Sequence, residues 1–136
     1  MIPVVPPFIQ HVIEHKAGGL AYVPTRAPFG YRYQSYRWDP ATKQLTVRLH
    51  DRHYSQSNAN RTVAVTAEWL KLPIAKCGDG NEKSYQVDGN RVFSAGGTLV
   101  WRCVRGTGGR TVKILVAGRN LPASTLAIVA SSVKRL

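Results

Sequence analysis

The sequence predicts an α+β fold: a curved antiparallel sheet of six to seven strands, with a short N-terminal helix and a C-terminal helix packed on it. Two observations predict this class. Apolar residues recur at helical spacing near each end of the chain, and large and polar side chains alternate with period two between the ends. Turn residues separate the alternating runs. The 136 residues have the length of one domain, and we expect residues 1–136 to form a single domain.

The N-terminal helix is predicted over residues 7–16. Its apolar face consists of Phe8, Ile9, Val12 and Ile13, and the following pair Gly18-Gly19 ends it. Residues 20–30 contain Pro24 and Pro28, so we expect an extended loop there.

A hairpin follows this loop. Residues 31–38 alternate large and polar side chains, residues 39–43 form a turn, and Leu45, Val47 and Leu49 share one face of the second strand. Further strands are predicted at 61–72, 84–87, 91–94, 98–104 and 111–117.

The last element, residues 122–136, is predicted to be a helix. Pro122 suits its first turn, and Leu126, Val129 and Val133 form its apolar stripe. We expect this stripe, together with Ile128 or Ala130, to close one face of the sheet.

The chain has two cysteines, Cys77 and Cys103, both next to strand-like sequence and without a nearby histidine pair. This pattern predicts a disulfide that ties two elements of the sheet, and hence an oxidising, extracytoplasmic compartment. Two buried free thiols in a cytosolic protein are the alternative. Trp101 lies two residues before Cys103, and we expect its side chain in the core beside the disulfide.

The first residues, Met1 to Pro7, lack the basic and apolar regions of a secretory signal. Two interpretations stay open. The chain is cytosolic, or it is secreted or displayed on the cell surface after removal of a leader. The cysteines favour the second interpretation.

The net charge is +12 and the pI is near 10.3, which indicates anionic partners. The basic residues are spread singly along the chain, whereas phosphate-binding surfaces cluster them. Nucleic acid is therefore one candidate partner, and an anionic polymer or lipid of the cell envelope suits the charge equally well. No apolar run reaches the length of a membrane span.

Four short motifs occur in a fixed order: Tyr22-Val-Pro-Thr-Arg-Ala-Pro-Phe-Gly-Tyr31, Val87-Asp-Gly89, Leu99-Val-Trp101 and the segment 121–131. In this order they resemble small sheet domains of uncharacterised secreted actinobacterial proteins that carry a Trp-Arg-Cys strand. More distantly, they resemble the sheet domains of lipoprotein carriers and periplasmic anti-sigma-factor regulators. The resemblance covers residues 20–136 and implies a curved sheet with a helix packed on it, outside the cytoplasm. It implies no functional residues, and this chain is more basic than those relatives.

Two histidine pairs are candidate metal ligands. His11 and His15 lie four residues apart on the predicted helix, a spacing that chelates zinc, and Glu14 between them is a candidate general base. His50 and His53 would add ligands if the two segments met. The alternative is a solvated polar helix face, because no glutamate on another helix supplies a third ligand.

The predicted strand 31–38 carries the candidate ligand-binding residues Tyr31, Arg32, Tyr33 and Arg37. With Tyr36 and Trp38 they are typical of a stacking platform for single-stranded nucleic acid. Period two instead predicts that the aromatic residues divide between the two faces of the strand. A third possibility keeps Tyr31 and Tyr33 on an exposed face that grips a ligand.

The sequence contains no catalytic set and predicts no cofactor. The leading hypothesis is a non-enzymatic extracytoplasmic domain that binds an apolar or anionic partner, either an envelope component or another protein. The alternatives are a basic module that binds single-stranded nucleic acid and a small zinc-dependent hydrolase that uses His11, Glu14 and His15.

Overall fold

The computed structural model describes residues 3–52, 61–78, 80 and 82–136. Seven strands form one antiparallel sheet in the order β2-β3-β4-β8-β7-β6-β5. The predicted α+β class and strand count are confirmed. The strands are β2 (Tyr31–Asp39), β3 (Gln44–Asp51), β4 (Thr62–Leu70), β5 (Lys83–Val87), β6 (Asn90–Ser94), β7 (Leu99–Arg105) and β8 (Thr111–Gly118).

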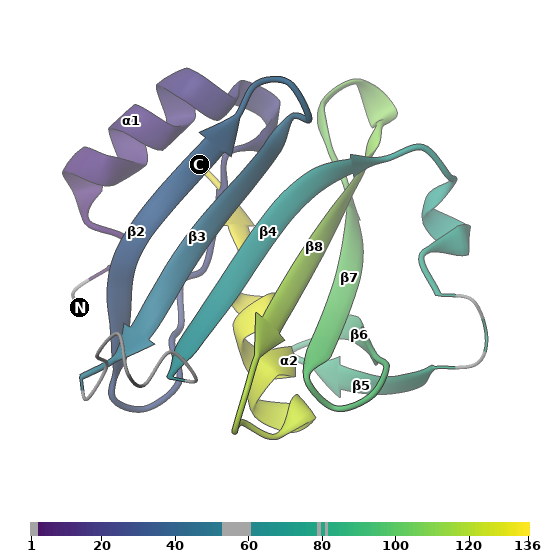
Figure 1. The fold of residues 1–136 in the computed structure, drawn as a ribbon. Helices are drawn as coiled ribbons and strands as arrows, with labels where there is room; N and C mark the ends of the chain where they lie inside the picture. Colours follow the sequence, from purple (N-terminus) through teal and green to yellow (C-terminus); the bar gives the residue numbers. More distant parts are fainter. Residues whose placement is uncertain (1–2, 53–60, 79, 81) are drawn as a thin grey trace.

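Two helices, α1 (Pro7–Ala17) and α2 (Ala123–Ser132), pack on one face of this sheet. Figure 1 shows α2 behind the central strands and α1 beside β2. Single 3-10 turns occupy Gly18–Leu20, Ile74–Lys76 and Thr107–Gly109. Within the described residues, neither helix is long and apolar enough to cross a membrane.

The C-terminal helix is shorter than predicted, because α2 ends at Ser132 and Val133 has an extended backbone. Strand β9 (Lys134–Arg135) then pairs with β1 (Tyr22–Val23), and the Leu136 amide donates to the Ala21 carbonyl at 2.8 Å. The last residues therefore satisfy their backbone groups by pairing with the loop predicted at 20–30, which a longer helix would leave unpaired.

The core lies between the sheet and the two helices. The inward side chains of β3, β4 and β8 are almost fully buried: Leu45, Val47, Leu49, Val63, Val65, Ala67, Val112, Ile114 and Val116. From α2, Leu126, Val129 and Ala130 are buried against them, as is Val133 just after the helix, whereas Ile128 is 39% exposed. The predicted closure of one sheet face by this helix agrees with these contacts, with Ala130 rather than Ile128 on the inner side.

The end of α2 is tied to two other parts of the fold by serine hydroxyls. Ser131 Oγ donates to the Val87 carbonyl and accepts from Asn90 Nδ2, both at 2.9 Å, which attaches the β5–β6 hairpin. Ser132 Oγ accepts from the amides of Thr25 and Arg26. These serines are structural, because their hydroxyls are used in holding the chain together.

The side chain of Arg102 on β7 points to the helix-covered side of the sheet. One of its Nη atoms donates to the Val133 carbonyl at 2.9 Å, at the C-terminus of α2, where a cation is favourable. Its Nε is buried and has no partner among the described residues. Burial lowers the pKa of Arg102.

The disulfide prediction is confirmed. Cys77 and Cys103 are bonded, with their Cα atoms 6.0 Å apart. Cys77 follows the 3-10 turn after β4, and Cys103 lies on β7 opposite Lys113. The bond therefore holds the β4–β5 connection against the sheet.

Candidate functional site

The sheet has one face that no described helix covers, and Figure 1 views the molecule from that side. We call it the open face. Side chains alternate along a strand, so each strand contributes every second residue to it. The register aligns these residues in rows, one of which runs across six strands through Arg37, Thr46, Thr66, Leu115, Trp101 and Phe93.

One side of the open face is cationic. Arg32 and Arg37 of β2 and Arg48 of β3 are exposed, and we call them the arginine strip. No carboxylate of the described residues lies within 4.0 Å of their side chains. In the β2–β3 register, Arg48 lies opposite Ser35, and Ser35 is two residues before Arg37. Arg32 lies opposite His50, and His50 is two residues after Arg48. The three cations therefore form a zigzag with diagonal Cα separations of about 7–8 Å.

The centre of the open face is lined by small side chains. Ala64 and Thr66 of β4 lie beside Ala117 of β8, and the hydroxyls of Thr46 and Thr66 are 3.3 Å apart. A shallow hollow of about 430 Å³ extends from this area to the sheet's end, and Arg48 is among its lining residues. A partner lying across the sheet would therefore meet little steric obstruction beside the arginine strip.

The far side of the open face is aromatic. The rings of Phe93 and Trp101 are 5.9 Å apart, and the Lys113 ammonium is 5.5 Å from the Trp101 ring. Trp101 Nε1 donates to the Cys77 carbonyl at 2.8 Å. The prediction that Trp101 belongs to the core is wrong: Val100 and Arg102 take the covered side of β7, which leaves Trp101 half-buried on the open face beside the disulfide.

We expect Trp101 to stabilise the fold less than a core tryptophan does. Trp101→Phe removes the indole hydrogen bond and should cost about 1 kcal/mol, and Trp101→Ala should cost about 2–3 kcal/mol because ring contact is lost as well. Urea unfolding measures both. Trp38→Phe is the control, because Trp38 makes no hydrogen bond through its side chain among the described residues, and it should cost less than Trp101→Phe. A Trp101→Ala cost of 5 kcal/mol would place the ring in the core after all.

The aromatic residues of β2 do not divide between the two faces, which contradicts the period-two prediction. The register shifts between Tyr33 and Ser35, so that one extra residue, Gln34, interrupts the alternation. As a result the four aromatic side chains of the strand all lie half-buried on the helix-covered side: Tyr31, Tyr33, Tyr36 and Trp38. The alternation of residue types does not reveal a bulge, because a bulge depends on how the backbone of β2 hydrogen-bonds to β3.

These tyrosines are partly withdrawn from water. Burial raises the pKa of Tyr31, with a further contribution from Asp51, and burial likewise raises the pKa of Tyr33, with Tyr36 adding to it. The Lys16 ammonium of α1 lies 5.8 Å from the Tyr36 ring. Of the four predicted ligand-binding residues, the structure thus places Arg32 and Arg37 on the open face and Tyr31 and Tyr33 on the other.

The predicted metal ligands His11 and His15 are exposed on α1, as is Glu14. No group of three His, Cys, Asp or Glu side chains in the described part of the chain could hold a metal ion. His50 lies on the open-face side of β3, away from the helix-covered side, and His53 lies outside the described residues. The zinc hypothesis stays a prediction without a third described ligand.

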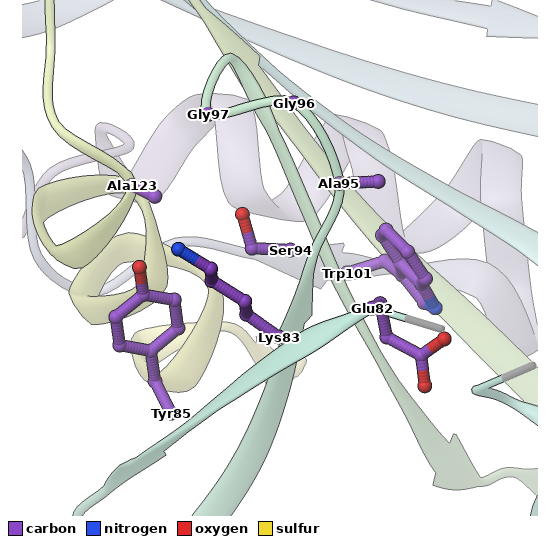
Figure 2. A pocket seen from close by; sticks show the side chains of 9 residues that line it. All are labelled: Glu82, Lys83, Tyr85, Ser94, Ala95, Gly96, Gly97, Trp101 and Ala123. Carbon is purple, nitrogen blue, oxygen red and sulfur yellow. The ribbon is translucent and has the colours of Figure 1, made fainter. Parts of the chain in front are cut away.

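Another hollow, of about 500 Å³, lies where β5 begins (Figure 2). Lys83, Tyr85 and Ser94 line it on one side of the strands, and Glu82 and Trp101 line it on the other (Figure 2). Among the described residues no histidine lines it; Lys83 lies opposite Ser94 in the β5–β6 register, and the two side chains are not hydrogen-bonded.

No protein-family model and no curated protein matches the chain. Among solved structures, a chain in the complex of Pseudomonas aeruginosa MucA/MucB is similar with a TM-score of 0.45 and 15% identity, over 84% of this chain and 34% of that one. A chain in a structure of MucB in complex with MucA(peri) is similar with a TM-score of 0.42 and 18% identity, over 84% of this chain and 36% of that one.

This chain thus spans about a third of the length of the chains it matches. The likeness concerns the course of the chain alone, not a site or partner. The actinobacterial relatives and their short motifs stay predictions.

Proposed function

We propose that this chain is a non-enzymatic interaction domain that binds an anionic partner on the open face of its sheet, outside the cytoplasm. The observation that carries the proposal is the arginine strip. None of its three exposed guanidinium groups forms an ion pair within 4.0 Å among the described residues, although the chain contains seven acidic residues. Asp39, on the same face of β2, interacts with Arg37 only at longer range. Guanidinium forks left unpaired on an uncovered surface suit carboxylate, sulfate or phosphate groups of a partner.

The compartment is supported by the disulfide. Cys77 and Cys103 are the only cysteines of the chain and they are bonded to each other. Structural disulfides persist in oxidising compartments and are rare in the cytosol. A secreted or cell-surface protein with net charge +12 would meet anionic envelope polymers, lipids and acidic proteins.

Single-stranded nucleic acid is the weaker candidate. Proteins that bind it combine a cationic groove with aromatic rings on which bases stack. Here the four aromatic residues of β2 face the helices, and on the open face the Trp101 ring lies against Lys113 and Phe93. The observations favour an anionic partner that needs no stacking platform.

Binding of a fluorescent poly-L-glutamate tests the proposal. We expect affinity that falls with rising salt, because bound charges release counterions. The variant R32Q/R37Q/R48Q should bind at least tenfold more weakly. The control K83Q/K134Q/R135Q removes the same number of charges from exposed positions outside the open face, and it should bind within twofold of the unaltered protein. Equal losses in both variants would show that net charge alone, without the open face, attracts the polymer.

A further inference from the structure

β2 forms one border of the described sheet, and none of the described residues pairs with its outer backbone edge. The strand pairs with β3 and with no other described strand (Figure 1). Between Arg32 and Trp38, its backbone has no hydrogen bond outside the β3 ladder within the described residues. A row of free N–H and C=O groups is a template on which another extended segment can pair.

The two sides of this edge differ in chemistry. On the open-face side it presents Arg32 and Arg37, both exposed. On the helix-covered side it presents half-buried aromatic rings, among them Tyr36 and Trp38. Phe8 of α1 adds to the apolar side: it is 76% exposed and lies two turns before Lys16, which contacts the Tyr36 ring.

We propose that an acidic segment of a partner protein adds to β2 as a further strand, with acidic and apolar side chains alternating along it. This inference rests on the proposed function and names its partner class. Successive side chains of an added strand point to opposite faces, so its carboxylates would meet the arginine strip while its apolar side chains cover the aromatic rings. Residues two apart on such a strand are about 6.6–6.8 Å apart, close to the spacing along the strip.

The bulge locates the pairing. Gln34 breaks the ladder, and residues 35–39 form the regular stretch beyond it. In this stretch Arg37 lies between Tyr36 and Trp38, which face the other side. A partner strand of about five residues fits this length, with Arg48 of β3 close enough to reach a carboxylate beside Arg37.

A second copy of this chain is a poor occupant of the same edge. Pairing β2 with its own copy would bring Arg32 and Arg37 of both copies together on one face of the joined sheet. Like charges opposite each other on neighbouring strands are destabilising. The arginines therefore discourage self-pairing while they favour an acidic strand.

The test uses three synthetic peptides of equal length and the intact disulfide-bonded protein. The first alternates glutamate and valine, the second has the same composition in two blocks, and the third is the alternating peptide with N-methyl groups on the amides of one edge. We expect fluorescence anisotropy to show binding of the alternating peptide, with the block and N-methylated peptides at least tenfold weaker. Arg37→Gln should weaken the alternating peptide at least fivefold, and the control Lys83→Gln on the opposite edge strand should leave it unchanged.

Several results would overturn the inference. Equal binding of the alternating and N-methylated peptides would remove strand pairing but leave the arginine strip as an anion-binding surface. Binding of poly-L-glutamate without binding of the alternating peptide would have the same meaning. Binding of a single-stranded DNA oligomer more tightly than any peptide, lost in R32Q/R37Q/R48Q, would assign the surface to nucleic acid. Self-association in sedimentation that Arg37→Gln strengthens would assign the edge to a second copy.

Discussion

Removing residues 122–136 should leave a protein that does not fold to a soluble monomer. These residues contain α2, whose side chains Leu126, Ala127 and Val129 are 0–1% exposed against the sheet. α2 lies so close to β8 that a Cβ added at Gly118 would come within 3.0 Å of Leu126 Cδ2. Deletion would expose the apolar side of three strands, which is an aggregation surface.

Sedimentation and the far-ultraviolet circular dichroism of the truncated chain measure this outcome. A single substitution in the full chain keeps the prediction testable if the truncated chain cannot be purified. Leu126→Ala should cost about 2–5 kcal/mol in urea unfolding, because its side chain is fully buried. Ile128→Ala on the same helix is the matched control and should cost under about 1 kcal/mol, because Ile128 is 39% exposed. A soluble truncated chain with cooperative unfolding would refute the role of α2.

The helices and strands of this fold can be predicted from the sequence because each produces a local periodicity of apolar residues. The helical stripe through Ile9 and Ile13 of α1, and the alternation through Leu45, Val47 and Leu49, both survive in the structure. The end of α2 could not be predicted in the same way. Val133 continues the apolar stripe, yet its neighbours leave the helix because β1 offers them hydrogen-bond partners from the other end of the chain.

The candidate site was predicted only in part, because it depends on strand order. Arg32 and Arg37 were identified from β2 itself, but Arg48 joins them through the pairing of β2 with β3. The bulge at Gln34 moves Tyr36 and Trp38 to the side of Tyr33, and no pattern of residue types reports it. Registers and bulges are set by non-local hydrogen bonds, whereas composition and periodicity are local.

Reduction of the disulfide should lower the free energy of unfolding by about 3–4 kcal/mol, because Cys77 and Cys103 are 26 residues apart and the bond restricts the unfolded chain. In the folded chain the bond fixes the segment after β4 over the aromatic side of the open face. The indole Nε1 of Trp101 donates a hydrogen bond to the Cys77 carbonyl at 2.8 Å. At Gly78 an added Cβ would come within 2.6 Å of the Phe93 ring, so this glycine lets the segment approach the sheet closely.

Urea unfolding with and without a phosphine reductant measures the loss, and intact mass confirms that two hydrogens are gained. The double variant Cys77→Ser/Cys103→Ser should lose a similar amount and should no longer respond to the reductant. Hydrogen exchange should quicken in β5 and β6, which the disulfide-linked segment precedes, and should change little in β2 and β3 at the other side of the sheet. The arginine strip lies on β2 and β3, so binding of poly-L-glutamate should survive in reduced protein kept below its unfolding transition. An unfolding midpoint that does not change on complete reduction would show that packing of Trp101 and Phe93, without the covalent bond, holds this segment in place.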